Sequence, residues 1–443
     1  MTIVAELSAA LPGRVLTAPD QLEALTRDAS RAVPAGAPRA AMRARSTDDV
    51  VAAIRWARRH GVPVSVRGAG TGLSGGAVAY ADGLVLALDA MDTILEIDPV
   101  DRLAVVEPGV TVARLTRAAA AHGLRYGPDP ASAARCTIGG TIATNAGGLR
   151  CIALGVTRDA VAGLEVVTGA GEVMRTGSRT RKSSTGYELT GLFVGSEGTL
   201  GVVTRAMVRL IPLPQEPAVA FSAWFADTAQ AVSAVSAVMA AGITPEMLEL
   251  LDEECLALLD GYAPGTAPRG GALLLGEASR EVAAAVAAVC RAGGARAVDQ
   301  GDARLLEART TINAALGAAG FAASCDVAVP VARLGEMLED IRRIAGEEGV
   351  RVCTFAHAGD GNLHPALVLA ESGPDALRRA DLLFERIATA AVGPGGVVSG
   401  EHGIGSLKLH SARAHADPVA QRLAGELRRL FDPDGILTPG RGV

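Results

Sequence analysis

The chain has 443 residues, of which 49% are hydrophobic, 20% are charged and only 3% are aromatic, and its formal net charge is -6. This apolar fraction is ample for the cores of two or three domains, which excludes global disorder. The mild acidity argues against a nucleic-acid-binding protein, because such a protein carries a basic stripe or a high pI. We therefore expect a small-molecule partner and no nucleic acid.

The sequence carries no sign of a membrane or secretory protein. No basic stretch precedes an apolar core at the start, and the longest apolar stretch, 217–243, is interrupted by Asp227 and Gln230. The six cysteines lie far apart and form no CxxC pair, which argues against a zinc ribbon or a disulfide framework. We expect a cytoplasmic protein, with a peripheral position at the inner face of the membrane left open.

The first part of the chain alternates between predicted helices and strands. Ser46 is expected to begin a helix that ends at Gly61, because acidic residues and then an apolar stripe follow the serine. A second helix is predicted from Thr111 to His122. Strands are expected at 63–68, 84–88, 94–97, 103–109, 160–168 and 202–214. Together these elements predict an α+β domain over residues 1–214.

The composition changes after this domain. Alanine-rich amphipathic stretches at 229–242 and 279–294 predict helices, with a strand between them. Short strands combined with helices of about fourteen residues favour an antiparallel sheet covered by helices on one face. We place this second domain at residues 215–410 and assign 411–443 to a C-terminal segment that returns to the first domain.

A glycine-rich loop over 68–77 formally matches a dinucleotide-binding fingerprint through Gly70, Gly72 and Gly75. A Rossmann unit requires a helix directly after the third glycine, whereas here a loop and then a strand are predicted, so we exclude that fold. The glycines still allow the backbone to approach an anionic ligand and to direct N–H groups at it. An ordinary wide turn is the alternative.

A second cluster, residues 137–148, contains four glycines, three threonines and one of only three asparagines in the chain. It also permits close approach of the backbone to a ligand. Two such clusters about seventy residues apart suit a long ligand with a pyrophosphate and two ring systems better than a simple nucleotide.

Paired histidines mark the second domain. Alternating apolar stretches flank Asp360-Gly361, which is a strong signal for a two-residue hairpin turn. If these residues form the centre of the turn, His357 and His364 lie directly opposite one another, with Cβ atoms roughly 5 Å apart. Two imidazoles at that separation can share a divalent cation, with Glu401 as an oxygen ligand. The alternative is a pair of ordinary hydrogen-bonded polar residues.

Eight segments in order resemble the signature set of the FAD-linked D-2-hydroxy-acid dehydrogenases: residues 67–77, 127–132, 136–148, 155–167, 185–204, 357–365, 400–408 and 432–439. This family, within the vanillyl-alcohol oxidase superfamily, includes glycolate oxidase FAD subunits, D-lactate dehydrogenases and D-2-hydroxyglutarate dehydrogenases. The resemblance covers nearly the whole chain. It implies a non-Rossmann FAD-binding domain of the p-cresol methylhydroxylase type and an antiparallel-sheet cap domain covered by helices.

The resemblance also implies the residues that bind FAD. Backbone N–H groups of 68–73 and 139–148 would contact the pyrophosphate, Pro128 and Asp129 would lie near the isoalloxazine, and Val202 or Val203 near the adenine. No histidine occurs in 67–77, so we expect non-covalent FAD. The further matching residues are Arg67, Gly68, Ala69, Gly70, Thr71, Gly72, Leu73, Thr137, Gly139, Gly140, Ala143, Thr144, Gly147 and Gly148.

The same resemblance implies the chemistry. His357, His364 and Glu401 would bind one divalent metal, Zn or Mn, His402 would be the base, and Arg309 would bind the substrate carboxylate. A 2-hydroxy acid would pass hydride to flavin N5, and the electrons would leave to a non-NAD acceptor: a quinone, a cytochrome, an electron-transfer flavoprotein or an iron–sulfur subunit. A homodimer is left open.

Two departures from the family pattern bear on the substrate. Ser324 and Ala366 stand where D-2-hydroxyglutarate dehydrogenases have a lysine and an asparagine that would bind a second carboxylate. We therefore favour D-lactate or glycolate, although Asn313 and other arginines offer compensation. The alternatives are a D-2-hydroxyglutarate dehydrogenase, an alkyl-glycerone-phosphate synthase-like transferase, and a non-catalytic FAD-binding subunit of a larger complex.

Overall fold

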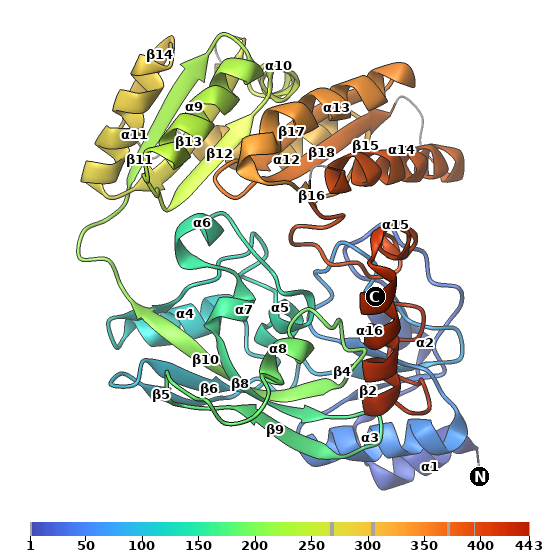
Figure 1. Cartoon of the computed structure of the whole chain (residues 1–443). Coiled ribbons are helices and arrows are strands. Elements are labelled where there is room, and N and C mark those ends of the chain that lie inside the picture. Colours follow the sequence, from blue (N-terminus) through green and yellow to red (C-terminus); the bar gives the residue numbers. More distant parts are fainter. Residues whose placement is uncertain (1, 266–269, 303–305, 370–372, 394, 443) are drawn as a thin grey trace. The chain divides into compact units, whose positions relative to one another are not determined.

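The computed structural model describes residues 2–265, 270–302, 306–369, 373–393 and 395–442. The chain divides into two compact units (Figure 1). The first unit comprises Met1–Gly148, Gly155–Leu213 and His402–Val443, and the second comprises Leu149–Leu154 and Pro214–Glu401. The second unit thus ends nine residues before the boundary placed at 410, directly ahead of His402.

One sheet of the first unit presents the first glycine loop. Its strands β1 (Val15–Leu16), β2 (Ala40–Arg43), β4 (Leu84–Ala87) and β3 (Val64–Arg67) are adjacent in that order, and β2, β4 and β3 are parallel. The helices that precede β3 are α1 (Ile3–Ala10), α2 (Pro19–Thr26) and α3 (Thr47–His60). As predicted, α3 begins after Ser46, whose side chain accepts the Asp49 N–H, and ends at Gly61 with a φ of 61°. The glycine loop therefore starts at the end of a buried strand.

A second, antiparallel sheet of the first unit supports the second glycine cluster. Its strands follow the order β5 (Ile94–Asp98), β6 (Leu103–Val106), β10 (Val202–Pro212), β8 (Val161–Val167) and β9 (Val173–Gly177), and β7 (Leu124–Tyr126) also pairs with β10. Buried Ile138, Ile142 and Phe193 belong to the same hydrophobic cluster as residues of this sheet. The helices in this part of the chain are α4 (Val112–Ala120), α5 (Ile138–Thr144), α7 (Thr157–Ala160) and α8 (Thr190–Phe193).

The C-terminal residues belong to the first unit. Helices α15 (Leu409–His415) and α16 (Pro418–Phe431) precede a short segment in which Leu437 forms a parallel bridge with Val64 of β3. The Asp432 carboxylate accepts the N–H groups of Ile436 and Leu437, which fixes the turn before this bridge.

The second unit is built on one antiparallel sheet of eight strands. The order is β14 (Ala297–Gln300), β11 (Val219–Phe225), β13 (Ala272–Ala278), β12 (Met247–Leu251), β17 (Arg351–His357), β18 (Asn362–Leu369) and β15 (Phe321–Ser324), and β16 (Val327–Ala328) also pairs with β18. The ladders β11–β13, β12–β13 and β17–β18 are all antiparallel, as expected. Figure 1 shows the long hairpin β17–β18 within this sheet.

Helices cover both faces of this sheet, so the expectation of one covered face is wrong. On one face α9 (Thr228–Ala240), α11 (Arg280–Ala292), α13 (Leu334–Glu347) and α14 (Pro374–Val392) pack against strand residues that include Leu248 and Leu250. On the other, α10 (Glu253–Tyr262) and α12 (Glu307–Ala318) pack against Met247 and Leu251. The reason is that β12 is apolar at consecutive positions, which is the pattern of a strand buried on both sides. The remaining short helices are α6 (Cys151–Leu154) and the 3-10 turn η2 (Val331–Arg333).

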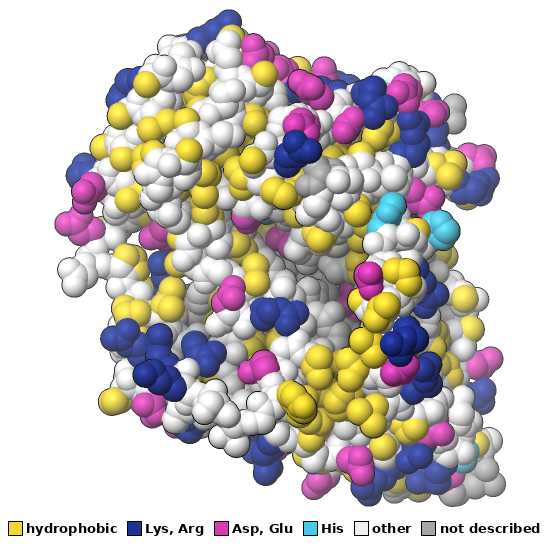
Figure 2. Space-filling view, in the orientation of Figure 1, with side chains coloured by type: hydrophobic (Ala, Val, Ile, Leu, Met, Phe, Trp, Pro, Cys, Tyr) yellow, Lys and Arg dark blue, Asp and Glu magenta, His cyan; other side chains and the backbone are white. Residues whose placement is uncertain are grey.

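The surface agrees with the composition. Figure 2 shows basic and acidic side chains interspersed over the visible face, without a continuous basic stripe. Among the residues that the structure describes, no helix is both long enough and apolar enough to cross a membrane.

Candidate functional site

The hairpin that carries the histidine pair has a different register from the one predicted. His357 pairs with Asn362, and His364 pairs with Phe355, so the turn consists of the four residues 358–361 rather than two. His357 and His364 are therefore diagonal neighbours and not direct partners, which corrects the prediction. Because the shift is two residues, and side chains alternate with a period of two, both histidines still lie on the same face. Their ring centroids are 4.9 Å apart.

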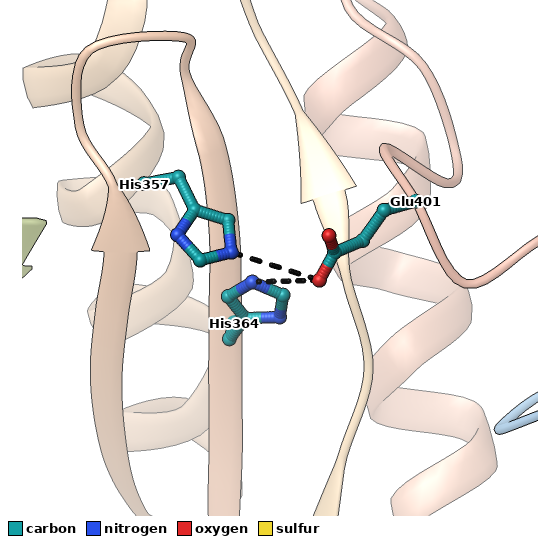
Figure 3. A group of neighbouring side chains, drawn as sticks. All are labelled: His357, His364 and Glu401. Atoms are coloured by element: carbon teal, nitrogen blue, oxygen red, sulfur yellow. Dashed lines mark ion pairs between the residues drawn. The ribbon is translucent and has the colours of Figure 1, made fainter. Parts of the chain in front are cut away.

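The two imidazoles meet a carboxylate from a segment distant in the sequence (Figure 3). Glu401 Oε1 lies 3.6 Å from His357 Nε2 and 3.5 Å from His364 Nε2. Both histidines are buried, and the three groups offer ligand atoms that all lie within 4.8 Å of one another. Two imidazole nitrogens and one carboxylate oxygen form a donor set that suits a divalent transition metal. The residues present therefore fit the metal that the sequence implies.

Glu401 is held by a buried aspartate. The Glu401 N–H donates to Asp326 Oδ2 over 2.7 Å, and the Ser399 hydroxyl donates to the same carboxylate at 3.1 and 3.2 Å. Asp326 is fully buried and directly precedes β16, which pairs with β18 of the hairpin. The backbone at Glu401 is thus tied to the hairpin that carries its two partners.

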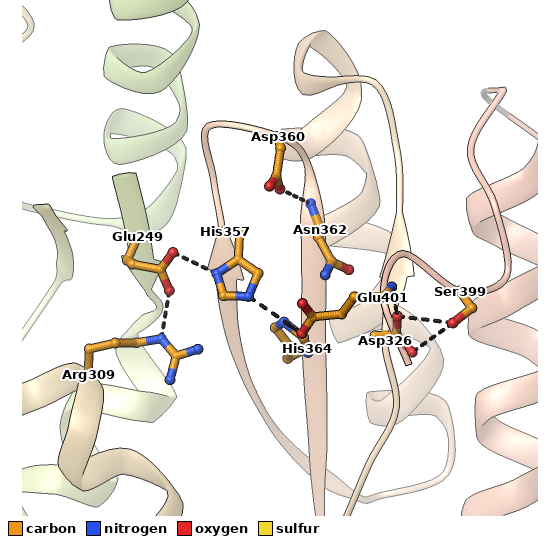
Figure 4. A network of polar contacts seen from close by, with 9 residues as sticks. All are labelled: Glu249, Arg309, Asp326, His357, Asp360, Asn362, His364, Ser399 and Glu401. Atoms are coloured by element: carbon orange, nitrogen blue, oxygen red, sulfur yellow. Dashed lines mark hydrogen bonds and ion pairs between the residues drawn. The ribbon is translucent and has the colours of Figure 1, made fainter. Parts of the chain in front are cut away.

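The structure adds a residue that the sequence reasoning missed. Glu249 of β12 is fully buried and pairs with His357 across the ladder β12–β17. Glu249 Oε1 lies 2.6 Å from His357 Nδ1, and Glu249 Oε2 accepts from Arg309 Nε over 2.6 Å (Figure 4). The available signal was a single charged residue within the otherwise apolar run of β12, which indicates a buried carboxylate that must have partners.

The carboxylates alter the protonation of His357. Burial lowers the pKa of His357, but the negative charges of Glu249 and Glu401 and their hydrogen bonds outweigh it, so this pKa lies well above the usual value of a histidine. The same two carboxylates that stabilise a proton on the ring would also stabilise a metal cation bound at Nε2 in place of that proton.

Arg309, the predicted carboxylate clamp, lies beside this cluster on α12. Its guanidinium carbon is 4.7 Å from the centre of the Phe355 ring, and its side chain is only 12% exposed. The ring of Phe355 also stacks on His364, with centroids 5.1 Å apart. Within the described part of the chain, the only hydrogen bond of the guanidinium is the one from Nε to Glu249, so both terminal nitrogens can bind an anion.

The two positions that depart from the family pattern are direct cross-strand partners. Ser324 of β15 pairs with Ala366 of β18, and Ala366 lies two residues beyond His364 on the same face. Neither residue carries a charge. The sheet therefore brings together two positions that the sequence analysis had connected only by resemblance.

In the first unit, the first glycine loop offers free backbone donors. In the part of the chain that the structure describes, the amides of Ala69, Gly70, Thr71, Gly72 and Leu73 donate no hydrogen bond to another protein group. Buried Arg67 precedes them and donates to the Arg27 carbonyl over 2.7 Å. A run of amides without internal acceptors suits an anionic ligand such as a pyrophosphate.

The second cluster lies against the first and contains a helix that was not predicted. A Cβ on Gly68 would lie 2.4 Å from Thr137 Oγ1, so the two clusters are in direct contact. Residues 138–144 form the helix α5, which the sequence analysis did not predict. The N–H of Gly139 donates to the Pro108 carbonyl, and that of Gly140 to Thr137 Oγ1. Both amides donate within the protein in this structure, and their contact with a pyrophosphate stays a prediction.

The other predicted cofactor residues lie in the same unit. Pro128 is buried in the loop after β7, and the Asp129 carbonyl approaches Gly148, where a Cβ would lie 2.4 Å from it. Ala143 and Thr144 form the end of α5, and Gly147 follows two residues after its last capping residue, Asn145. Val202 is buried at the start of β10, and Val203, the next residue, faces the other side of the sheet and is half-buried. Their contacts with FAD remain predictions.

His402 begins a loop that a buried carboxylate holds in place. Glu197 Oε1 accepts the N–H of Ile404 over 2.7 Å, and Glu197 Oε2 accepts the N–H of Gly405 over 2.9 Å. Ser74 of the first glycine loop donates to the Gly403 carbonyl over 2.9 Å and accepts the Ser406 N–H. Gly405 has a φ of 53°, and a Cβ there would lie 2.0 Å from the Ser74 carbonyl oxygen, so only glycine fits. The loop 402–408 is thus attached to the first glycine loop.

Comparisons with known proteins agree with this architecture. Residues 38–177 match the FAD binding domain family, and residues 213–441 match the family of FAD linked oxidases, C-terminal domain. A glycolate oxidase subunit GlcD from Bacillus subtilis (strain 168) is 38% identical over 418 residues, which cover 91% of this chain and 88% of that protein. A D-lactate dehydrogenase from Archaeoglobus fulgidus is 35% identical over 426 residues, covering 93% of this chain and 94% of that protein.

Solved structures confirm the predicted fold. The structure of p-cresol methylhydroxylase with substrate bound superimposes with a TM-score of 0.79 at 20% identity, covering 99% of this chain and 96% of the other. At that level of identity the likeness concerns the fold alone. Both family models match, and the relatives align over most of their length. The chain therefore belongs to the FAD-linked oxidases and is an FAD-dependent oxidoreductase.

Proposed function

We propose that this enzyme oxidises a small D-2-hydroxy acid, D-lactate or glycolate, to the 2-oxo acid. The proposal rests mainly on the convergence of His357, His364 and Glu401 beside Arg309, which provides a metal-binding donor set and a carboxylate-binding group on one face of a sheet. The two relatives described above are, by their names, a glycolate oxidase subunit and a D-lactate dehydrogenase, which supports the same substrate class.

The charges of the cluster suit a divalent ion together with a monocarboxylate. Arg309 and Glu249 form an ion pair, and the Glu401 carboxylate offers a negative charge to a divalent ion, Zn or Mn. The second positive charge of such an ion can pair with the carboxylate of the substrate. His357, His364 and Glu401 would hold this ion.

Each proposed step uses a residue of this chain. When bound, FAD accepts a hydride at N5, and the divalent ion polarises the substrate hydroxyl and carboxylate. Arg309 presents two terminal nitrogens to the carboxylate and so orients C2. His402 takes the hydroxyl proton, because an imidazole exchanges protons near neutral pH. His402 directly follows Glu401 in the chain, so their Cα atoms are separated by one peptide unit.

The proposed substrate is small because the second unit lacks a group for a second carboxylate at two paired positions. Ser324 and Ala366 offer neither a cation nor an amide there. A dicarboxylate would place its distal charge beside these residues without compensation for the lost hydration. D-2-hydroxyglutarate should therefore be a poor substrate.

We propose that the FAD is held non-covalently and, once reduced, would pass its electrons to an acceptor. The proposed acceptor is a quinone, a cytochrome, an electron-transfer flavoprotein or an iron–sulfur subunit rather than NAD. The relative from Bacillus subtilis is named as a subunit, which is consistent with an acceptor on a partner protein.

Anaerobic flavin reduction tests the reaction directly. Mixing with D-lactate or glycolate should bleach the flavin absorbance, whereas L-lactate should not and D-2-hydroxyglutarate should act slowly. His402→Ala should slow bleaching by about a hundredfold or more without loss of FAD, because it removes the base. His410→Ala, which changes an exposed histidine of α15, is the matched control.

The outcomes separate the alternatives. Faster bleaching by D-2-hydroxyglutarate than by D-lactate or glycolate would refute the substrate and leave the reaction standing. Absence of bleaching by every 2-hydroxy acid would refute the reaction, and would favour an alkyl-glycerone-phosphate synthase-like transferase or a non-catalytic subunit.

A further inference from the structure

Glu249 is a buried carboxylate whose two oxygens contact two different candidate functional groups. The side chain has no exposed surface, and its partners Arg309 and His357 are 12% and 6% exposed. A carboxylate in such surroundings is costly unless each oxygen has a strong partner. Here Oε1 contacts His357 Nδ1 and Oε2 accepts from Arg309 Nε, both at 2.6 Å.

The first of these contacts determines which nitrogen of His357 faces Glu401. An ionised carboxylate can only accept a hydrogen bond, so Nδ1 of His357 carries a proton. The other nitrogen, Nε2, lies 3.6 Å from Glu401 Oε1 and is therefore the atom that a divalent ion would contact in place of a proton. A carboxylate that fixes a histidine in this way also makes the ring a stronger ligand.

The second contact fixes the direction of the Arg309 fork. With Nε bonded to Glu249 and the guanidinium carbon 4.7 Å from the Phe355 ring centre, the side chain is held at two points. The terminal nitrogens are then oriented before any substrate arrives. A guanidinium held in advance loses less conformational freedom when it binds a carboxylate.

We propose that Glu249 is a positioning residue that couples the metal-binding histidine to the substrate-binding arginine. This inference rests on the proposed function and extends it to a residue outside the metal and substrate groups. Loss of the carboxylate should weaken metal binding and, separately, raise the KM for the hydroxy acid. The two effects share one cause because the same side chain holds both partners.

The central variant is Glu249→Gln, which keeps the shape of the side chain. Its carbonyl oxygen can accept from His357 or from Arg309 but not from both, and its amide then faces a donor. The matched control is Glu253→Gln, because Glu253 also lies in the second unit and is hydrogen-bonded to Thr228 and ion-paired with Arg342. The control should leave the metal affinity unchanged.

Metal affinity is measured without turnover, by competition between a chelator and the FAD-loaded protein for Mn²⁺ or Zn²⁺. Glu249→Gln should bind the ion about 10- to 100-fold more weakly than the wild type, as expected for loss of a group that orients a ligand. KM for D-lactate at saturating metal should rise by a larger factor than kcat falls, because Arg309 acts in substrate binding.

A spectroscopic measurement distinguishes positioning from a general structural effect. In zinc-loaded protein labelled with ¹⁵N-histidine, the Nδ1–H proton of His357 should resonate at unusually low field, because its acceptor is a charged carboxylate. The signal should move upfield in Glu249→Gln, remain in Glu253→Gln, and be absent in His357→Asn.

The results separate this inference from the proposed function. A wild-type protein that binds no divalent ion would overturn the proposed metal site itself. A wild-type protein that binds the ion, together with a Glu249→Gln variant of unchanged affinity and unchanged Nδ1–H resonance, would overturn only the positioning role.

A second variant covers the case in which Glu249→Gln does not fold. Arg309→Lys keeps the positive charge but loses the Nε donor that orients Glu249. Coupling between two sites is reciprocal, so this substitution should lower the metal affinity by several-fold. Unchanged metal affinity in Arg309→Lys would contradict the coupling.

Discussion

The histidine pair of the second unit and His402, the proposed base in the first unit, are held in different ways. His357 and His364 belong to paired strands, and their backbone is fixed by the ladder β17–β18 and by β12 on one side. His402 lies outside any helix or strand, in a loop whose amides are bonded to the Glu197 carboxylate and the Ser74 carbonyl.

Because of this difference, we expect the hairpin and the loop to respond to different substitutions. The strand-borne pair has many backbone hydrogen bonds behind it, so its arrangement should depend mainly on its own side chains and on Glu249. The loop depends on the buried Glu197 carboxylate and on Ser74, both from elsewhere in its unit, and on glycines that tolerate close approach. Metal binding should therefore respond to changes in the hairpin, and proton transfer to changes in the loop support.

The largest effect is expected for His357→Ala, which removes one of the proposed ligands. The variant should lose its divalent ion and with it the polarisation of the substrate, a loss on the order of a thousandfold in the rate of flavin reduction. Elemental analysis and stopped-flow absorbance provide the two measurements. The control is His60→Ala, which changes a histidine of the first unit that packs against Trp56. This variant should retain the ion. Full activity of an extensively chelated wild-type enzyme would contradict the role of the metal.

A smaller effect is expected for Glu197→Ala, which removes the support of the loop. The amides of Ile404 and Gly405 lose their acceptor, which should cost about 1–3 kcal/mol of folding free energy. Flavin reduction should slow by about tenfold, since His402 would be less well oriented. Chelator competition should show an unchanged metal affinity, and thermal unfolding gives the stability.

If Glu197→Ala weakens metal binding as much as it slows flavin reduction, the loop and the hairpin respond as one region, which would contradict the expected difference between them. Glu172→Ala, a change at an exposed glutamate of the first unit, controls for the loss of a surface charge.

The smallest effect is a dependence of stability on pH. Burial raises the pKa of Glu197 above its usual value, although the N–H groups of Gly405 and Ile404 and the charges of Lys408 and Arg441 lower it. Between the usual and the raised pKa, the folded state binds more protons than the unfolded state, so this group's contribution to stability falls as the pH rises. A glutamine at position 197 does not titrate, so Glu197→Gln should lack this contribution to the pH dependence of stability.

The free energy of unfolding, measured by denaturant titration from pH 5 to pH 8, provides the test. Relative to the wild type, Glu197→Gln should gain stability as the pH rises through the raised pKa of the glutamate. A constant difference across this range would show that Glu197 has an ordinary pKa in the folded protein.

Much of the fold follows from local sequence patterns. The helix α3 is marked at both ends, by Ser46 and by Gly61, and its limits agree with the prediction. The helix α5 was missed because its glycines are poor helix formers; Thr137 caps it, and Ile138 and Ile142 are buried in the core of the first unit. In such a segment tertiary packing outweighs the intrinsic propensity.

In the candidate site, too, local patterns predicted one part of the arrangement and tertiary packing decided the rest. The sequence could place His357 and His364 on one face of a hairpin. Side chains alternate between the two faces, so a turn that is longer by two residues leaves both histidines on the same face. It could not give their register, since the turn also depends on the contact between Gly361 and Val329 of another segment.

The sequence by itself determined which groups are available: glycine clusters that suit an anionic cofactor, two histidines and a glutamate that suit a metal, and a family pattern over nearly the whole chain. Only the tertiary structure decided which groups meet. Glu249 and Arg309 are separated by 60 positions and lie on a strand and a helix, yet they share a hydrogen bond. Periodicity reports the face on which a residue lies, whereas contacts between distant segments arise from the packing of whole elements, and no local pattern encodes them.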